Sequence, residues 1–367
     1  MPRLRAELKS RSYEVLVARG ALAELGAGLV PLRPAGHVVV CCDDNVAPLY
    51  LETASESLRG AGFGVSHIVI PAGEAQKSLG RATEMYGVLY DRGVRRGDLV
   101  VALGGGVIGD LAGFVAATYL RGVGLVQAPT TLLAQVDAAV GGKVGVDFRA
   151  GKNYVGAFYQ PLLVVADPDA LATLPPRELR SGAAEVAKYG FLAGGALLEA
   201  VEALAAVADG GTDGLVRGFG EEIIAGCVDE KLAVVARDER EESGERAVLN
   251  LGHTIGHAVE AATGFSRYTH GEGVALGLRA VLWLSERLCG LAGADVQRGL
   301  RLLDAVGLPL RFRGATIEAV CELTARDKKT GAEGVEFVLL EGFGRPRLRA
   351  QVPAGLLEEV VTWLSAR

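Results

Sequence analysis

Short runs of β-branched and other apolar residues alternate with helical stretches through the first half of the chain. The runs, each bounded by turn residues, lie at 37–45, 66–74, 98–106, 124–131 and 162–169. Between them, segments such as 46–62 and 78–93 carry apolar residues at helical spacing. Strands that alternate with helices predict a parallel sheet covered by helices on both faces.

The pattern changes at the segment LATLPPREL, residues 171–179. Its two consecutive prolines interrupt any helix, and the strand pattern almost disappears beyond them. Helical spacing then dominates, at 178–192, 214–236, 250–263, 273–291, 295–308 and 354–366. One late exception, 334–344, predicts a short hairpin or a loop. We therefore expect an α/β domain over 1–170 and a mostly helical domain over 171–367.

Length and composition narrow the class of protein. A chain of 367 residues exceeds the usual size of a single hydrophobic core, and 50% hydrophobic residues exclude general disorder. The formal charge of −6 argues against nucleic acid or an anionic membrane as the main partner. An anionic substrate therefore needs a local basic cluster. Without a signal-like or membrane-length apolar stretch, we expect a soluble, cytoplasmic protein.

A glycine-rich segment joins a predicted strand to a predicted helix at 98–122. Gly104, Gly106 and Gly109 match the G-x-G-x-x-G pattern, in which backbone N–H groups at a helix N-terminus bind a pyrophosphate. The segment follows the third predicted strand, and no acid lies about 20 residues further on to hold a ribose. The acid can instead come from the end of the first predicted strand, at Asp43 and Asp44. The alternative is a tight strand–helix turn with no ligand.

A second polar cluster spans 130–153. It contains Lys143 and Lys152 in stretches that we expect to be glycine-rich loops, and these suit phosphate oxygens. Each lysine alone is as well explained by a solvated loop, but together, where strands end, they favour an anion site. The other polar members of the cluster are Thr130, Thr131, Asp137 and Asn153.

Three of the five histidines lie within 253–270. His253 and His257 are four residues apart and project from one face of a helix, where two imidazoles can share one zinc ion. The alternative is that one of them binds the metal and the other carries a proton, with His270 completing the ligand set. Packing or capping explains a single helical histidine, but less readily explains three together.

A carboxylate is also a common ligand of catalytic zinc. Glu185 lies in an apolar helical stretch, where an ionised carboxylate without a cation is costly. Lys188 follows three residues later on the same helix face. An ordinary salt bridge on a surface helix is the alternative, and the surrounding Ala and Val disfavour it.

Together these residues resemble the 3-dehydroquinate synthase family, over essentially the whole chain. Eight motifs occur in the family's order: PAGEAQKS, GGGVIGDLAGFVAATYLRG, PTTLLAQVDAAVGGK, GKNYVGAFYQP, LPPRELRSGAAEVAKYG, LNLGHTIGHAVE, HGEGVALG and DKK. The resemblance implies a Rossmann-like domain that binds NAD, and a helical domain that binds a divalent metal, zinc in most members with cobalt possible.

The resemblance also implies roles for individual residues. The metal ligands would be Glu185, His253 and His270, and this assignment leaves His257 to contact substrate or relay a proton. NAD would be held by Asp44, Glu74, Lys77, Gly106, Gly109, Asp110, Thr130, Thr131, Lys143, Lys152 and Thr173. Substrate would be held by Asp137, Lys143, Asn153, Lys188, Lys231, Arg246, Asn250, His257 and Lys328. Arg121 corresponds to an arginine that reaches the neighbouring subunit's phosphate, which implies a homodimer.

Three positions depart from the family's pattern. Ala72 stands where an acid is common, and Asp147 stands where asparagine is common. Glu245 replaces the leucine that usually precedes Arg246.

The implied reaction converts 3-deoxy-D-arabino-heptulosonate 7-phosphate to 3-dehydroquinate and phosphate, a lyase step of the shikimate pathway towards chorismate and the aromatic amino acids. It combines transient oxidation by NAD, loss of phosphate, re-reduction and an internal aldol closure. Another sugar-phosphate cyclase, of the inosose or valiolone type, is the nearest alternative. A metal-dependent polyol dehydrogenase would release NADH and needs no basic cluster. A catalytically silent NAD-binding module would not need the Glu185, His253 and His270 set.

Overall fold

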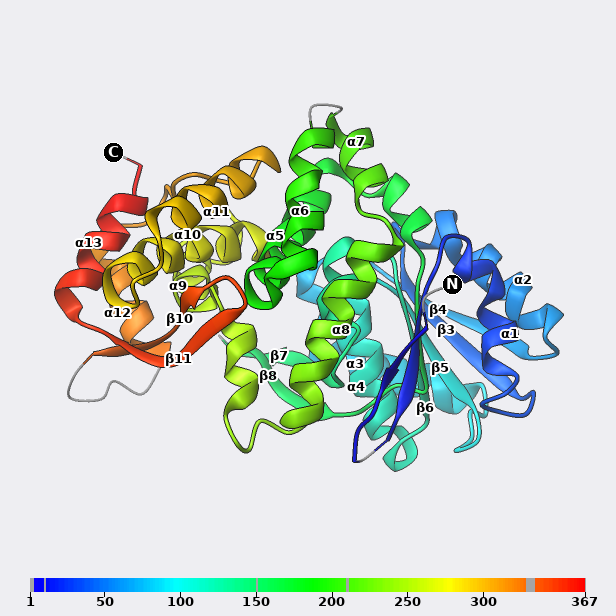
Figure 1. Cartoon of the computed structure of the whole chain (residues 1–367). Coiled ribbons are helices and arrows are strands. Elements are labelled where there is room, and N and C mark those ends of the chain that lie inside the picture. Colours follow the sequence, from blue (N-terminus) through cyan, green and yellow to red (C-terminus); the bar gives the residue numbers. More distant parts are fainter. Residues whose placement is uncertain (1–2, 10, 150, 209–210, 328–333, 367) are drawn as a thin grey trace. The chain divides into compact units, whose positions relative to one another are not determined.

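The computed structural model describes residues 3–9, 11–149, 151–208, 211–327 and 334–366. The chain forms two compact units, Met1–Leu174 and Pro175–Arg367. We call the first the sheet unit and the second the helical unit (Figure 1). The predicted fold class, a Rossmann-like parallel-sheet region followed by a mostly helical region, is confirmed.

A seven-stranded sheet forms the centre of the sheet unit, in the order β1-β2-β9-β6-β5-β3-β4. All neighbouring strands in the series β2-β9-β6-β5-β3-β4 pair in the parallel direction, and only β1 pairs with β2 in the antiparallel direction. The strands are β1 (Arg3–Ala6), β2 (Tyr13–Val17), β3 (His37–Asp43), β4 (Gly64–Ile70), β5 (Leu99–Gly104), β6 (Gly124–Pro129) and β9 (Leu163–Ala166). The sequence analysis missed β1 and β2, so the glycine-rich turn follows the fifth strand and not the third.

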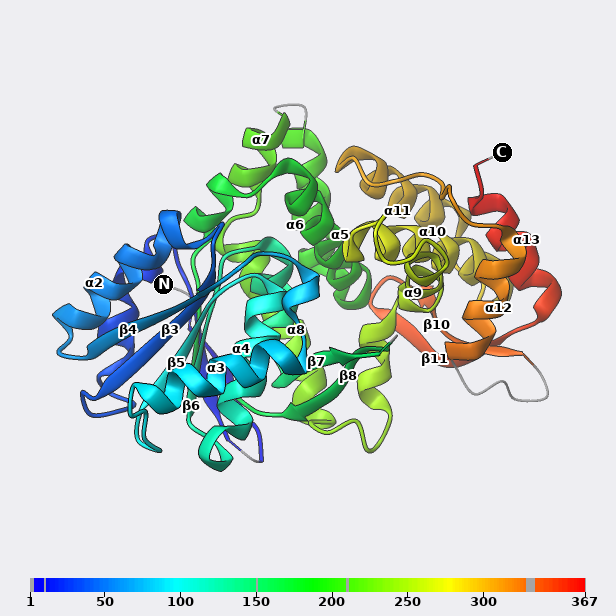
Figure 2. The same ribbon diagram turned by 180° about the vertical axis from the view of Figure 1, so that it is seen from behind.

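The sheet is buried on both faces, because successive strand residues point in opposite directions. In β3, Val38 and Val40 face one apolar cluster, and Val39 faces the other. The first cluster contains leucines of α1 (Leu25–Leu29) and α2 (Glu52–Gly60), and the second contains apolar residues of α3 (Leu79–Asp91) and α4 (Gly106–Thr118). Figures 1 and 2 show these helices about the sheet. The all-apolar strand runs reflect this double coverage.

The order of the strands places a switch point between β3 and β5. The chain leaves β3 for β4 on one side and then returns to pair β5 with the other side of β3. Ligands of open α/β sheets bind at the carboxyl ends of strands beside such a point. Here those ends are Asp43–Asp44 and Gly104–Gly105, so the acids and the glycines that the sequence analysis singled out lie at neighbouring strand ends.

The lysine-bearing segment after β6 forms an antiparallel hairpin, and the expectation of glycine-rich loops at Lys143 and Lys152 was wrong. Its strands are β7 (Lys143–Phe148) and β8 (Gly151–Phe158). Glycines Gly145 and Gly156 face each other in this pair, and a Cβ at Gly156 would lie 2.4 Å from the Val144 carbonyl oxygen. The glycines therefore permit a close strand pair that packs Val144 and Val146 with the buried residues of α4.

The helical unit contains most of the helices that the sequence predicts. They are α5 (Pro176–Ala193), α6 (Gly195–Ala208), α7 (Gly211–Gly218), α8 (Glu221–Arg237), α9 (His253–Ala262), α10 (His270–Leu288), α11 (Gly293–Ala305), α12 (Ile317–Asp327) and α13 (Ala354–Leu364). The expected hairpin is longer than predicted and consists of β10 (Val335–Gly342) and β11 (Arg345–Val352).

Short helical turns complete the two units. In the sheet unit they are η1 (Ala21–Glu24), η2 (Ala47–Leu51), η3 (Glu74–Gln76), η4 (Tyr119–Arg121), η5 (Ala134–Ala138) and η6 (Pro168–Thr173). In the helical unit, η7 (Glu245–Asn250) leads into α9. Among the described residues, no helix combines the length and the apolar character that crossing a membrane requires.

Helix α10 approaches its neighbours so closely that only glycine fits at the contacts. A Cβ at Gly277 would lie 1.7 Å from the carbonyl oxygen of Gly252, directly before α9. A Cβ at Gly271 would lie 1.8 Å from the carbonyl oxygen of Ser181 on α5. Real Cβ atoms cannot approach backbone oxygens so closely, so these two glycines set the spacing of α5, α9 and α10.

We expect Gly277→Ala to destabilise the helical unit by about 1–3 kcal/mol, because the added methyl group must push α9 and α10 apart. Gly355 is the matched control, because it lies in α13 with open space around its Cβ position. Gly355→Ala should be neutral or should stabilise by up to about 1 kcal/mol. Urea unfolding of both variants measures the difference, and equal unfolding midpoints would contradict the close-approach argument.

Candidate active site

Three helices of the helical unit bring the predicted metal ligands together. Glu185 comes from the middle of α5, His253 from the first residue of α9 and His270 from the first residue of α10. Oxygen Oε1 of Glu185 lies 3.5 Å from Nε2 of His253 and 3.5 Å from Nε2 of His270. The three side chains therefore converge on one point.

These separations fit a bound metal ion. Zinc bonds to nitrogen and oxygen of 2.0–2.2 Å at tetrahedral angles place ligand atoms about 3.3–3.6 Å apart. Two imidazoles and one carboxylate are also a common ligand set of catalytic zinc, which leaves a further position open for substrate. The residues present thus fit a divalent cation in both geometry and chemistry.

Both imidazole rings are held at their other nitrogen, so that Nε2 points to the shared position. Nδ1 of His253 lies 3.1 Å from the carbonyl oxygen of Leu251, and Nδ1 of His270 lies 3.1 Å from Oε1 of Glu260. Because a carbonyl oxygen and a carboxylate only accept hydrogen bonds, each Nδ1 carries a proton, and a ring that is otherwise deprotonated would present its Nε2 lone pair to a metal ion.

The start of α10 is fixed by its own sequence. Thr269 and Glu272 form a capping box, in which each side chain accepts a hydrogen bond from the other residue's backbone N–H. The Glu272 carboxylate also accepts two hydrogen bonds from Arg177 of α5, at 2.9 and 2.7 Å. Although burial opposes its charge, these donors lower the pKa of Glu272. The cap and the Arg177 contact together determine where His270 lies.

Charge in this cluster favours a cation. Glu185 is completely buried, and its second oxygen, Oε2, forms an ion pair with the buried Lys188. Burial lowers the pKa of His253 well below 6.5. Burial also disfavours charge on His270, but hydrogen bonds to Glu185 and Glu260 outweigh it and raise the pKa of His270 to about 10. Without a metal, a proton on His270 partly balances the carboxylates, and a bound metal ion would displace it.

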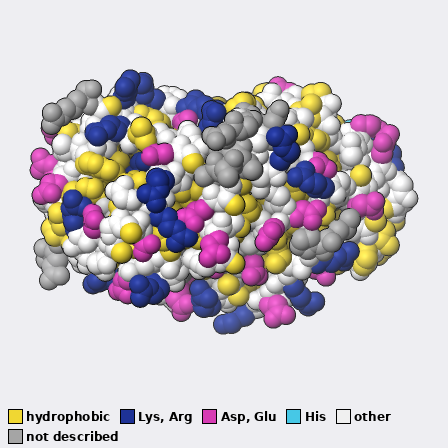
Figure 3. All heavy atoms as spheres, turned by 45° about the horizontal axis from the view of Figure 1, so that its top comes forward, with side chains coloured by type: hydrophobic (Ala, Val, Ile, Leu, Met, Phe, Trp, Pro, Cys, Tyr) yellow, Lys and Arg dark blue, Asp and Glu magenta, His cyan; other side chains and the backbone are white. Residues whose placement is uncertain are grey.

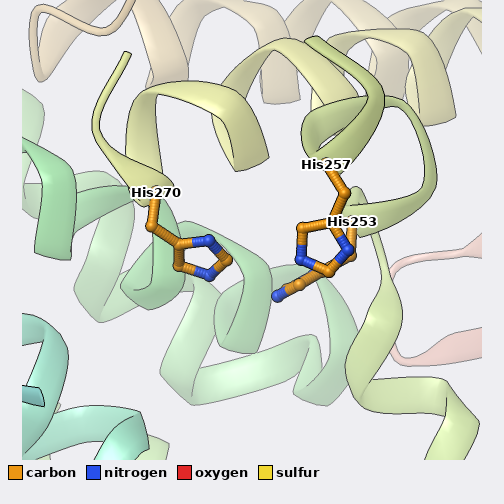
Figure 4. A group of neighbouring side chains, drawn as sticks. All are labelled: His253, His257 and His270. Atoms are coloured by element: carbon orange, nitrogen blue, oxygen red, sulfur yellow. The ribbon is translucent and has the colours of Figure 1, made fainter. Parts of the chain in front are cut away.

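His257 lies beside the ligand set at its exposed edge. Its ring nitrogens lie within 4.8 Å of those of His253 and His270, and the three rings face a common space (Figure 4). Oε1 of Glu185 lies 3.5 Å from Nε2 of both His253 and His270. Glu185 and His257 both lie near these two rings, and His257 is the exposed one of the two.

Arg246 is buried in the segment that joins α8 to α9. Its Nη1 donates to the carbonyl of Glu239 at 2.8 Å, and its backbone N–H donates to Asp238. The Asp238 carboxylate also accepts from Glu242 and Ser243, and these hydrogen bonds overcome the effect of burial and lower its pKa to about 2. Glu245 instead pairs with Arg237, so the departure at Glu245 does not displace Arg246.

The other substrate residues predicted in this unit lie on α8, at the end of η7 and beyond α12. Lys231 is buried on α8, which packs against α5. Asn250 is exposed at the end of η7. Lys328 lies outside the described residues.

Within the sheet unit, several predicted NAD residues lie together. Lys77 is buried and contacts Asp110 at 2.5 Å. Burial opposes the charge of Lys77, but Asp110 outweighs it and raises the pKa of Lys77. Lys152 lies 3.8 Å from Glu74, and the backbone of Asp147 donates to the carbonyl of Lys77. The β7–β8 hairpin thereby joins the segment at 74–77.

The first turn of α4 provides a possible binding surface for a diphosphate. Its N-cap residue, Gly105, supplies no side-chain cap, so backbone N–H groups of the first turn are available. Gly106 begins the helix, and Gly109 lies so close to Gln127 that a Cβ would be 3.0 Å from its Oε1. Asp44 holds the next segment through a 2.9 Å hydrogen bond from the Ala72 N–H.

Thr130 and Thr131 directly follow β6 and lie beside the glycine-rich turn: the Thr130 N–H donates to the Gly104 carbonyl at 3.0 Å, and a Cβ at Gly105 would lie 3.0 Å from the Thr131 methyl group. Asp137 lies in η5. Asn153 has a positive φ of 55° and donates its N–H to Asp147. Arg121 is exposed, with a φ of 65°. Thr173 contacts the hydroxyl of Tyr50 at 2.5 Å. These positions leave their proposed roles as predictions.

Sequence reasoning missed Glu260, Asp238 and the Thr269–Glu272 cap. A signal for Glu260 was present, because it is the one acid of the apolar α9 helix and follows His253 by seven residues, two turns along one face. The capping box is readable in the sequence THGE. Nothing local to Asp238 distinguishes it from its acidic neighbours.

The fold and the arrangement of this site indicate the class of the sugar-phosphate cyclases. The structure superposes on 2-deoxy-scyllo-inosose synthase with a TM-score of 0.87 at 25% identity, covering 98% of this chain and 99% of that one. It also superposes on 2-epi-5-epi-valiolone synthase from Streptomyces hygroscopicus, with a TM-score of 0.84 at 27% identity, covering 98% of each chain. A probable glycerol dehydrogenase from Sinorhizobium meliloti shares the fold, with a TM-score of 0.65 at 18% identity over 95% of each chain.

Sequence comparison identifies the family. Residues 67–181 match the 3-dehydroquinate synthase N-terminal model, and residues 182–330 match the C-terminal model. The 3-dehydroquinate synthase of Paracoccus denitrificans is 46% identical over 365 residues, 97% of both chains. That of Nitrobacter winogradskyi is 46% identical over 364 residues, 96% of this chain and 93% of its own. The chain belongs to the 3-dehydroquinate synthase family, which confirms the predicted resemblance, and the alternative functions are not favoured.

We expect Glu185→Gln, His253→Ala and His270→Ala each to weaken Zn²⁺ binding by more than 100-fold, beyond the roughly 10–100-fold that loss of an outer-shell partner costs. His257→Ala is the matched control on α9 and should retain one zinc ion per chain. Competition with a chromophoric chelator measures each affinity. Loss of zinc in the His257 variant, with retention in the Glu185 variant, would identify the three histidines as the ligands.

Proposed function

We propose that this chain uses NAD and one divalent metal ion to convert 3-deoxy-D-arabino-heptulosonate 7-phosphate to 3-dehydroquinate and phosphate. The observation that carries the proposal is the convergence of Glu185, His253 and His270, in a chain that matches curated members of the family over nearly its full length. The solved inosose synthase, in complex with carbaglucose-6-phosphate, NAD⁺ and Co²⁺, supports both cofactors. The valiolone synthase, with NAD⁺ and Zn²⁺, supports them as well.

The protein would hold each cofactor in one unit. Glu185, His253 and His270 would bind the metal, with zinc the expected ion and cobalt an alternative. NAD would lie at the carboxyl edge of the sheet, with its diphosphate at the first turn of α4 and its ribose near Asp44. When bound, NAD would accept and return a hydride, and the metal would polarise adjacent substrate hydroxyl groups.

Basic side chains would neutralise the substrate's carboxylate and phosphate. Lys188 and Arg246 are buried in the helical unit, and burial strengthens their interaction with an anion. On the face shown in Figure 3, basic and acidic side chains are interspersed. An acidic chain thus binds a polyanion through a few enclosed cations rather than through its general charge. The proposed substrate residues are Asp137, Lys143, Asn153, Lys188, Lys231, Arg246, Asn250, His257 and Lys328.

Proton movement would depend on groups at the edge of the ligand set. Oxidation of the C5 hydroxyl of the substrate makes the C6 proton acidic, and elimination then transfers that proton to a base as phosphate leaves. The substrate's own phosphate oxygen can take the proton. His257, which is exposed beside the metal ligands, is placed to exchange protons with water or substrate.

We expect the purified protein, loaded with Zn²⁺, to release many phosphate ions from the heptulosonate phosphate for each NAD present. Because the hydride is returned within each cycle, absorbance of NADH should not accumulate. Phosphate release and absorbance at the NADH band, followed together, measure both. Accumulation of one NADH per substrate would instead indicate a polyol dehydrogenase, and turnover of glucose 6-phosphate in place of the heptulosonate would indicate an inosose-type cyclase.

We also propose that the chain acts as a homodimer, with Arg121 of the partner subunit at the substrate phosphate. Leu120 and Arg121 both have positive φ, at 51° and 65°, which is a strained backbone for these residues, and Arg121 is exposed. Tyr159, at the end of the β7–β8 hairpin, donates to Val123 just beyond this turn. The hairpin exposes Tyr154, 79% accessible, and Phe158. Exposed aromatic side chains on this hairpin, together with an exposed arginine on a strained backbone, are consistent with a surface that meets a second copy of the chain.

The dimer proposal predicts complementation between two inactive variants. Arg121→Ala and Glu185→Gln should each be inactive alone. After subunit exchange, hybrid dimers would contain one intact site, so an equal mixture should recover roughly a quarter of wild-type activity. Sedimentation measures the dimer, and Tyr154→Asp should dissociate it. A monomeric wild type, or no recovery in mixtures proven to contain hybrids, would contradict the proposal.

A further inference from the structure

Glu260 is a buried carboxylate beside the candidate metal site that has no role in the reaction described above. It lies on α9 with 2% of its surface exposed, and its Oε1 lies 3.1 Å from Nδ1 of His270 on α10. Burying a carboxylate without a strong partner is costly, so the contact with the imidazole explains why an acid is tolerated in this apolar helix.

The neighbouring helix is shaped to admit this carboxylate. Gly273 lies one turn after His270 on α10, and a Cβ at this position would lie 2.9 Å from Oε1 of Glu260 and 3.0 Å from its Cγ. The missing side chain at Gly273 therefore provides the space that Glu260 occupies beside the ring. The first turn of α10 therefore supplies both the imidazole ring, at His270, and the space for the carboxylate, at Gly273.

The two proposed histidine ligands differ in how they are oriented. His253 directs Nδ1 at the backbone carbonyl of Leu251, which no substitution removes. His270 directs Nδ1 at a side chain. A carboxylate in this position fixes the tautomer and the orientation of the ring, and it makes Nε2 a stronger ligand.

We propose that Glu260 is a positioning residue, which holds the Nδ1–H of His270 and so presents its Nε2 to the metal, in space provided by Gly273. The inference rests on the proposed metal site. Metal affinity would then depend on Glu260, a residue that contacts neither the ion nor the substrate.

The test compares Zn²⁺ affinity, by chelator competition, for the wild type, Glu260→Gln and Glu260→Leu. Glutamine keeps a neutral acceptor and leucine has none. We expect affinity to fall in the order wild type, glutamine, leucine, with a loss of about 10–100-fold for leucine. In the zinc-loaded protein, the Nδ1 proton of His270 should resonate upfield in the glutamine variant, because its acceptor is no longer charged. Glu286→Gln, an exposed change on α10, is the control and should change neither.

Gly273→Ala provides a second route if Glu260→Leu does not fold. The added methyl group should displace the Glu260 carboxylate and weaken zinc binding while leaving Glu260 in the chain. Its effect and that of Glu260→Gln should be less than additive in the double variant, since both act through one hydrogen bond.

The outcomes separate this inference from the proposed function. A wild type that binds no zinc would remove the proposed metal site itself. A wild type that binds zinc, with folded Glu260 and Gly273 variants of unchanged affinity and an unchanged Nδ1 resonance, would overturn the positioning role alone.

Discussion

Helix α10 meets α5 and α9 through backbone contacts that leave no space for a side chain. A Cβ at Gly271 would overlap the Ser181 carbonyl, and one at Gly277 would overlap the Gly252 carbonyl. Close approach brings the first residue of α10, His270, within 3.5 Å of Glu185 on α5. It also places His270 beside Glu260 on α9. The convergence of the proposed ligands thus depends on the close helix spacing that these glycines permit.

The electrostatics of the cluster follow from the same packing. Two buried carboxylates contact the two ring nitrogens of His270: Glu185 lies beside Nε2 and Glu260 lies beside Nδ1. Lys188, which pairs with Glu185, supplies one positive charge. With neutral imidazoles, the cluster carries one net negative charge, and a divalent cation changes this to one positive. A metal ion at the proposed site would therefore offset the cost of burying the carboxylates and would also attract an anionic substrate. Both attractions, that of the ion to the carboxylates and that of the site to an anionic substrate, are strong because solvent screens buried charges poorly.

Much of the fold was predictable because its signals are periodic. Apolar runs buried on both faces predicted β3, β5 and β6, and helical spacing predicted α5, α9 and α10. The strands β1 and β2 were missed, and the β7–β8 hairpin was mistaken for loops, because its glycines serve close strand pairing rather than turns. Spacing alone left His253 and His257 as possible joint ligands, and the family resemblance selected Glu185 and His270. Glu260 was missed because its partner lies on another helix, and tertiary packing decides that contact.

The built-in orientation of the ligands has an energetic consequence for metal binding. In many small metal sites, the ion must order the chain, and part of the binding free energy is consumed by folding. Here, the Leu251 carbonyl, Glu260 and the capped start of α10 orient both rings without the ion. The glycine contacts fix the spacing of the helices that carry the ligands. Without a metal ion, a proton on His270, whose pKa is raised to about 10, partly balances the two carboxylates. At the proposed metal site, an ion would replace that proton between side chains that are already oriented. Such an exchange favours a rigid site with a defined open position over one that changes shape when the ion enters.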